Sequence, residues 1–273
     1  MIEDIIKVVI LSLIEGVTEF LPISSTGHLV VGTSLLKFDV MDSVFEIFIQ
    51  IGAVAAVIAY YRSTLLSHVK EIRNAPAARG FWLRVALGSL PAAATGFLFG
   101  RQIEALLFTP HVVAVSLILG GVVFLLVERK LSTLKLRAEE PTAISSISLR
   151  QAIVVGLVQV LALIPGVSRS GSSIVGGMLA GMNRRLATEF SFFLAIPLLG
   201  GATVYKLLAS FDSLDTSQLL LLFIGAALSA LFAWLAIDWL LRFIARSSFV
   251  VFGYYRIAAG LLVLAAASAG WLA

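Results

Sequence analysis

The stretch Glu15-Gly-Val-Thr-Glu-Phe-Leu-Pro-Ile-Ser-Ser-Thr-Gly-His28 decides the fold, because it places polar groups within a strongly apolar part of the chain. It holds two carboxylates, three consecutive hydroxyl side chains and an imidazole, and apolar residues precede and follow it. Even on lenient insertion scales, one charged side chain at membrane depth costs about 2.5–3.5 kcal/mol. So many polar groups within fourteen residues predict a functional site.

The two carboxylates of this stretch are four residues apart, so on a helix Glu15 and Glu19 share one face, about one turn from each other. Two like charges at that separation repel each other in apolar surroundings. They therefore require a cation, a shared proton or a basic partner.

A helix break follows at Pro22, and the polar turn Ser24-Ser25-Thr26-Gly27 precedes a second apolar run. A turn that opens a helix with free backbone N–H groups and a glycine suits a phosphate group. Two plainer interpretations stay open. Hydroxyls in membrane helices commonly bond back to a carbonyl, and His28 fits a helix cap as well as a catalyst.

The composition indicates an integral membrane protein, since 59% of the 273 residues are hydrophobic, 13% are charged and the mean hydropathy is +1.02. The net charge of +4 does not point to nucleic acid, because the basic residues lie between apolar runs, where they set membrane orientation. The absence of cysteine excludes disulfides and thiolate metal sites. We expect no cleaved signal peptide, because the first apolar run contains two glutamates.

Two pairs of apolar segments are each interrupted by a proline and a polar turn. The second arm of each pair is too short to cross about 30 Å of hydrocarbon at 1.5 Å per residue. Each pair is therefore predicted to be a re-entrant helix-loop-helix hairpin whose loop stays buried. The arms are expected at residues 5–21 and 27–36, and at 152–164 and 174–181.

Six other apolar runs are long enough to span a membrane, so the predicted fold is all-α, with six transmembrane helices and two re-entrant hairpins. The two halves align with an offset near 144, which places Gln159 opposite Glu15. This predicts one membrane domain in two repeats, about 1–127 and 151–273, joined by a cytoplasmic link at about 128–150. The spans are expected at residues 45–61, 85–99, 111–127, 186–208, 218–241 and 249–272.

Three spans per half is an odd number, so the repeats are predicted to be inverted, with the hairpin tips meeting near the midplane. Most loop lysines and arginines fall on the side of the 128–150 link, which is therefore predicted to be cytoplasmic, with both termini outside. This arrangement brings Arg169 towards the first hairpin. Its guanidinium fits a phosphate bidentately, although an ion pair with a glutamate is the alternative. A second pair, Asp238 with Arg256, is predicted near the cytoplasmic interface.

The motifs E-G-V-T-E, F-L-P-I-S-S-T-G-H and P-G-V-S-R-S together resemble the undecaprenyl-diphosphate phosphatases of the bacitracin-resistance type. The resemblance covers nearly the full chain, including F-E-I-F-I-Q-I-G-A and T-E-F-S-F-F-L-A-I-P. It implies a bacterial inner-membrane enzyme whose active site opens to the periplasm. It also implies hydrolysis of the prenyl diphosphate carrier to the monophosphate, which recycles the carrier for peptidoglycan synthesis and gives bacitracin resistance.

Carried over by position, the resemblance makes Glu15 and Glu19 the acidic pair, Ser25 and His28 the reactive hydroxyl and imidazole, and Arg169 the phosphate clamp. Dependence on a divalent cation is also implied, and we expect Glu15 and Glu19 to hold Mg²⁺ or Ca²⁺. Either Ser25 or a water is the nucleophile. The remaining phosphate-binding groups are expected to be Ser24, Thr26, Gly27, Ser168, Ser170, Gly171 and Ser173, the last standing where the family often has threonine.

The alternative function is a transporter or flippase of polyprenyl phosphate, since inverted repeats and broken helices are typical of transporters. A hairpin that carries paired glutamates, a hydroxyl and a histidine favours the enzyme, because phosphoryl transfer needs positioned charges. The expected partners are the polyprenyl diphosphate and membrane lipids, with no nucleic acid, and a homodimer stays open.

Overall fold

The computed structural model describes residues 2–36, 42–133, 143–209 and 219–272, and within these ranges every regular element is a helix. The α-helices are α1 (Ile2–Phe20), α2 (Ser25–Leu36), α3 (Asp42–Tyr60), α4 (Arg62–Lys70), α5 (Pro76–Leu107), α6 (Pro110–Thr133), α7 (Leu149–Gln159), α8 (Arg169–Leu179), α9 (Arg184–Ala209), α10 (Leu219–Ile244) and α11 (Val250–Ser268). Two 3₁₀ turns, η1 (Ile144–Ser146) and η2 (Val160–Leu163), flank α7.

Length and composition make five of these helices, α5, α6, α9, α10 and α11, able to cross a membrane. The count reaches six if α3 and α4 form one span, bent by 72° at its break. The all-helical membrane fold is therefore confirmed, and the six predicted runs correspond to these helices. The stretch after residue 61, which lies outside the predicted spans, begins as helix α4, whose Leu65 packs against the hydrophobic core.

The two predicted hairpins are present as pairs of packed helices, α1 with α2 and α7 with α8. The chain leaves α1 just before Pro22 and leaves η2 just before Pro165, as expected from the missing N–H and fixed φ of proline. The second arms are short, with 12 residues in α2 and 11 in α8. The re-entry of both hairpins and the opposite orientation of the halves stay predictions.

The two hairpin turns share an uncommon backbone conformation at matched positions. Ser24 has φ 73° and Ser168 has φ 76°, and they are 144 residues apart. Each side chain accepts a hydrogen bond from an N–H three residues later, that of Gly27 at 3.4 Å and that of Gly171 at 3.1 Å. A side chain at positive φ costs about 1–3 kcal/mol and persists only where its surroundings hold it. The predicted offset therefore pairs two turns of the same geometry.

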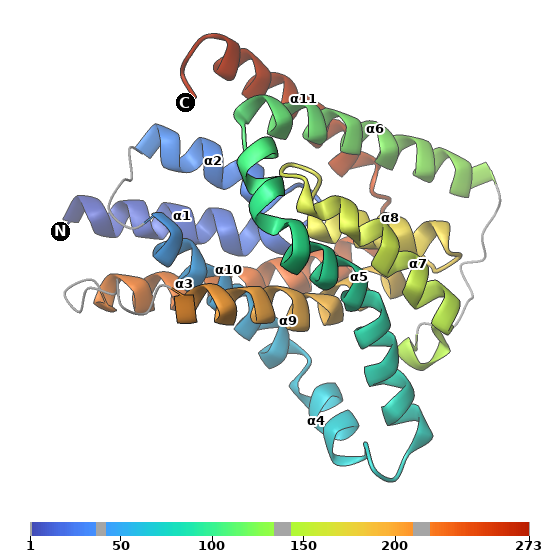
Figure 1. The fold of residues 1–273 in the computed structure, drawn as a ribbon. Helices are drawn as coiled ribbons and strands as arrows, with labels where there is room; N and C mark the ends of the chain where they lie inside the picture. The colour runs from blue at the N-terminus through green and yellow to red at the C-terminus, as the bar shows by residue number, and fades with distance from the viewer. Residues whose placement is uncertain (1, 37–41, 134–142, 210–218, 273) are drawn as a thin grey trace.

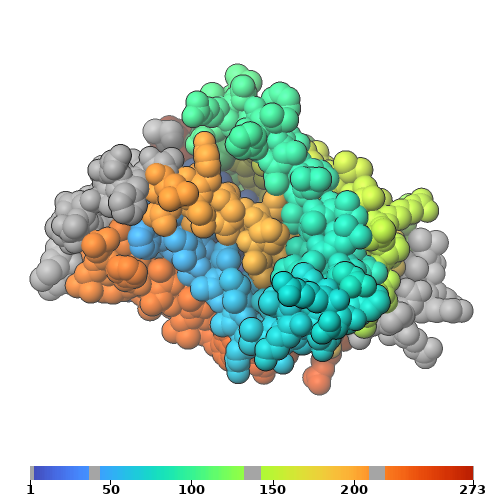
Figure 2. All heavy atoms as spheres, turned by 60° about the horizontal axis from the view of Figure 1, so that its bottom comes forward, coloured from blue at the N-terminus to red at the C-terminus, as the bar shows by residue number. Residues whose placement is uncertain are grey.

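Around the hairpins the long helices form three packed groups. α10 packs against α1 and α3, α11 against α6, and α9 against α3, α5 and α8 (Figure 1). Figure 2 shows α9 between α3 and α5 on one face, with α4 and the first turns of α5 in front. The contact between α10 and α1 is close because Gly16 has no Cβ, and a Cβ there would lie 2.6 Å from the Ser229 carbonyl. The first turn of α1 and the last turns of α11 lie at the left of Figure 1, opposite the C-terminal end of α6.

Candidate active site

The tips of the two hairpins meet, so residues far apart in sequence form one polar cluster. Arg169, the first residue of α8, places Nη2 3.0 Å from Glu19 Oε1, across 150 residues of sequence. Ser170 Oγ donates to the carbonyl of Leu21 at 2.9 Å. The predicted approach of Arg169 to the acidic hairpin is therefore present in the structure.

Glu19 lies between a hydroxyl and a guanidinium. Ser25 Oγ donates to Glu19 Oε2 at 2.5 Å, while Oε1 accepts from Arg169. Glu19 and Ser25 are buried, at 6% and 9% exposure, so the carboxylate acts on the serine proton with little screening by water. Glu19 is therefore placed to accept the hydroxyl proton of Ser25.

Arg169 is fixed by a residue that was not predicted to belong to the site. Its Nη1 donates to Ser191, to the carbonyl at 2.9 Å and to Oγ at 3.2 Å, and Ser191 Oγ lies 2.7 Å from Ser173 Oγ. Its Nε is buried and has no hydrogen-bond partner in the described part of the chain. Ser191 lies on α9 at 0% exposure, and the only sequence signal for it was a lone hydroxyl within F-S-F-F.

Glu15 is buried at 2% exposure, one turn before Glu19 on α1. Its Oε1 has no hydrogen-bond partner within the described ranges, and the charges of Glu19, Glu46 and Arg169 act on it. No group of three or more His, Asp or Glu side chains among the described residues is placed to hold a metal ion. Within the described ranges, Glu15 and Glu19 form an acidic pair with one carboxylate oxygen that has no partner.

His28 is held by Ser24 and Tyr255. Its Nδ1 lies 2.7 Å from the carbonyl of Ser24, which can only accept, so Nδ1 carries a proton. Its Nε2 lies 2.6 Å from the hydroxyl of Tyr255, and the two rings stack at 5.6 Å. The described hydrogen bonds of His28 do not reach Ser25. Nothing in the sequence distinguished Tyr255 from Tyr254.

Several residues predicted to bind phosphate shape the turns. Ser24 and Ser168 cap their helices, as described above, and Ser168 Oγ lies 3.0 Å from Ser170 Oγ. Ser173 Oγ bonds back to the carbonyl of Arg169 at 2.8 Å, the plainer role that the sequence left open for such hydroxyls. The first residues of α2 and α8, Ser25 and Arg169, both contact Glu19, and Thr26, Gly27 and Gly171 lie in the first turns of these helices.

The predicted pair of Asp238 with Arg256 is wrong. Asp238 pairs with Arg242, one turn along α10, and also accepts from the hydroxyl of Tyr60 at 3.3 Å. Arg256 is completely buried and donates to four backbone carbonyls. Nη1 reaches Pro22 at 3.1 Å, and Nη2 reaches the carbonyls of Ser116, Gly166 and Val167 at 3.3, 3.0 and 3.0 Å. One side chain thus joins the turns of both hairpins.

We expect Arg256→Leu to lower the melting temperature in detergent by about 10 °C, because it leaves buried carbonyls of both turns unpaired. Turnover should fall with it, since the turns position the polar cluster. The matched control is Arg242→Leu, because Arg242 is 77% exposed in its side chain and forms a surface pair, for which about 1 kcal/mol or less is expected. Equal melting of the two variants would contradict the role given to Arg256.

Fold and cluster together define a class: a multi-pass membrane protein in which two helical hairpins bring an acidic pair, a serine and an arginine into one buried site. The family model for "Bacitracin resistance protein BacA" matches residues 8–262. The chain belongs to this family.

Similar proteins cover almost the whole chain. "Undecaprenyl-diphosphatase 1" of Burkholderia lata is 45% identical over 271 residues, which is 98% of this chain and 97% of the relative. "Undecaprenyl-diphosphatase" of Verminephrobacter eiseniae is 46% identical over 98% of this chain and 97% of its own, and that of Acidovorax ebreus is 47% identical over 97% and 96%. The family resemblance predicted from the motifs is confirmed.

Proposed function

We propose that this protein is an undecaprenyl-diphosphate phosphatase, which hydrolyses the prenyl diphosphate to the monophosphate and inorganic phosphate. Its family membership and the names of its relatives support this function. The observation that carries it is the 2.5 Å hydrogen bond from Ser25 to a glutamate that is also paired with Arg169. A hydroxyl with a base beside it, and a guanidinium paired with that base, suits phosphoryl transfer, which needs an activated nucleophile and positioned charge.

In this proposal Ser25 Oγ attacks the terminal phosphorus, and its proton passes to Glu19. The bond from that phosphorus to the bridging oxygen breaks, and the prenyl monophosphate leaves. Water then cleaves the phosphoserine, which restores the hydroxyl and releases inorganic phosphate. Arg169 stabilises the charge on the transferring phosphoryl group through its unpartnered Nε and through Nη2, which moves from Glu19 to a phosphate oxygen. The backbone N–H groups at the starts of α2 and α8 assist it.

The acidic pair suits a divalent cation. The buried Oε1 of Glu15 is an unpaired oxygen ligand, and hard cations such as Mg²⁺ are commonly held by one or two carboxylates together with substrate phosphates. Glu15 would hold the ion together with Glu19, and when bound the ion supplies neutralising charge for the diphosphate. Mg²⁺ and Ca²⁺ both fit this donor set.

We assign His28 to the leaving group rather than to the nucleophile, since its hydrogen bonds run to Ser24 and Tyr255. Protonation of the departing monophosphate oxygen would use the imidazolium form of His28: Nε2–H turns from the Tyr255 hydroxyl to that oxygen and gives up its proton, while Nδ1–H stays on the Ser24 carbonyl. The enzyme would lie in the bacterial inner membrane with the site open to the periplasm, where it recycles the carrier for peptidoglycan synthesis and thereby opposes bacitracin.

The direct test is phosphate release from undecaprenyl diphosphate by detergent-purified protein, with and without a chelator. We expect one phosphate per substrate, prenyl monophosphate as the other product, and loss of turnover when the cation is removed. Movement of polyprenyl phosphate across a vesicle bilayer without phosphate release would instead favour the transporter.

We expect Glu15→Gln and Glu19→Gln each to lower activity and to raise the cation concentration needed for half-maximal rate, because each keeps the size of the side chain and removes a charge. Titration of Mg²⁺ against turnover measures this, with the exposed Glu104→Gln as the control. Cation dependence that is unchanged in both variants would point to a shared proton or to the Arg169 pairing alone.

A further inference from the structure

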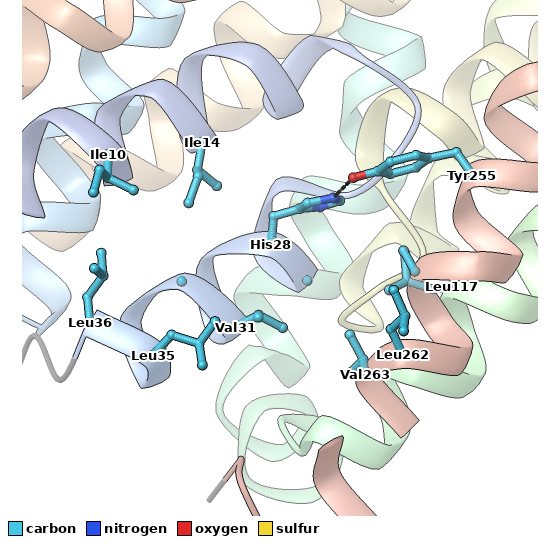
Figure 3. Close-up of a pocket in the computed structure, with 13 residues that line it drawn as sticks. Ile10, Ile14, His28, Val31, Leu35, Leu36, Leu117, Tyr255, Leu262 and Val263 are labelled. Carbon is cyan, nitrogen blue, oxygen red and sulfur yellow. Dashed lines mark hydrogen bonds between the residues drawn. The ribbon is translucent and has the colours of Figure 1, made fainter. Parts of the chain in front are cut away.

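An apolar groove runs beside the polar cluster, between the first hairpin and the α6–α11 pair (Figure 3). Its volume is about 380 Å³. Of its thirteen lining residues, only His28 and Tyr255 have polar side chains, and the rest are aliphatic or glycine. Figure 3 shows the His28–Tyr255 pair at one end of the groove and Leu35 and Leu36 towards the other.

We propose that this groove binds the first isoprene units of the prenyl chain, with the His28–Tyr255 pair at the junction between the chain and its diphosphate. The inference rests on the proposed function and adds to it the place where the lipid part of the substrate is recognised.

The groove adjoins the candidate active site. Gly27 and His28 line it, and both belong to the turn of α2 that also carries Ser25. A diphosphate beside Ser25 would therefore have its ester end at the polar head of the groove. The absence of a Cβ at Gly27 lets this end of α2 pack closely against α6, since a Cβ there would lie 3.2 Å from the Val113 side chain.

The other end of the groove suits a long chain that continues into the bilayer. Leu35 and Leu262 line it and are 68% and 72% exposed, so it opens on the outside of the helix bundle. A pocket of this volume holds only the start of a polyprenyl chain, and the remainder would lie among lipid tails. A free phosphate or a soluble nucleotide gains nothing from such a lining, whereas a branched hydrocarbon fills it.

Binding here cannot depend on the hydrophobic effect alone, because lipid tails are as apolar as the groove. Selection must come from close packing, so it is sensitive to the shape of the groove. Ala259 is the residue to change: it lines the groove one turn beyond Tyr255 on α11, and a larger side chain there would occupy the space of the prenyl chain.

The test compares Ala259→Phe with the matched control Ala258→Phe, which changes the neighbouring exposed residue outside the groove. For Ala259→Phe we expect KM for undecaprenyl diphosphate to rise roughly tenfold or more, with the rate on methyl diphosphate, which has no tail, unchanged. The control should behave as the unaltered protein on both substrates. Equal effects on both substrates, or an equal effect in the control, would contradict the assignment of this groove to the prenyl chain.

A second measurement on the unaltered protein does not depend on the folding of a variant. A prenyl diphosphate with a photoreactive group on its first isoprene unit should label peptides of α2 and α11. Labelling confined to other helices would overturn the groove even if the protein hydrolyses undecaprenyl diphosphate. A protein that takes up the probe in the groove but releases no phosphate would instead refute the proposed hydrolysis.

Discussion

Ser25→Ala is expected to reduce turnover by a factor on the order of 10³ or more, because it removes the proposed nucleophile. Without that hydroxyl, Glu19 and Arg169 have no nucleophile to assist. Ser24→Ala should be milder. Ser24 only caps Gly27 at 3.4 Å, and alanine retains the Cβ that its positive φ already accommodates. Phosphate release by both variants, with melting temperature in detergent to confirm folding, measures the difference.

The pair also separates two mechanisms. If Ser25→Ala kept near-normal turnover, Ser25 could not be the nucleophile, and a metal-activated water would be the better mechanism. If both serine variants lost turnover together with melting temperature, the loss would lie in the turn and not in the chemistry.

Arg169→Lys is expected to lose at least about a hundredfold in turnover while the protein still inserts and stays folded. The guanidinium donates in two directions, with Nη1 on Ser191 and Nη2 on Glu19, and its Nε is left for the substrate. Lysine is a point charge on a flexible stem and cannot hold the first two contacts while presenting the third.

The structure contains the Arg169–Glu19 ion pair, which the sequence left open as the alternative to a phosphate clamp. A purely structural ion pair predicts that lysine would replace arginine with little loss of rate. Arg185→Lys is the control, because the Arg185 side chain is 55% exposed and pairs with Glu189 one turn along α9. An active Arg169→Lys enzyme would rule out the clamp and leave only the ion pair.

The features that the sequence predicted well, the helix ends and the membrane spans, depend on short stretches of residues or on the summed hydrophobicity of a run. Pro22 and Pro165 each follow the end of a helix, whereas Pro91 and Pro197 lie inside α5 and α9. Proline followed by a polar turn, rather than proline alone, therefore made both hairpins predictable from a few residues each. The long spans follow from apolar length. The meeting of Arg169 with Glu19 required one further step, the internal repeat, and the predicted offset also pairs the two serines with positive φ.

Most of the contacts that the sequence missed are made to backbone carbonyls, which no pattern of side chains reveals. Asp238 was predicted to be the partner of Arg256, but its own helix supplies Arg242 one turn away. Arg256 instead binds backbone carbonyls, which every residue has, so no pattern of side chains could point to them. Ser191 was missed for a related reason, since half of its contact with Arg169 is through the main chain.

A cation satisfied by main-chain oxygens has a consequence for how this site can be altered. Arg256 fixes the path of both turns through their backbone carbonyls, without using any side chain from them, so the side chain of Val167 can be exchanged without loss of that link. Gly166 is the exception, because its φ of 89° and the Val113 carbonyl beside it exclude a Cβ. The side chains of the turns can therefore be varied while Arg256 keeps the backbone of both turns in place, which is useful for redirecting the enzyme to other lipid phosphates.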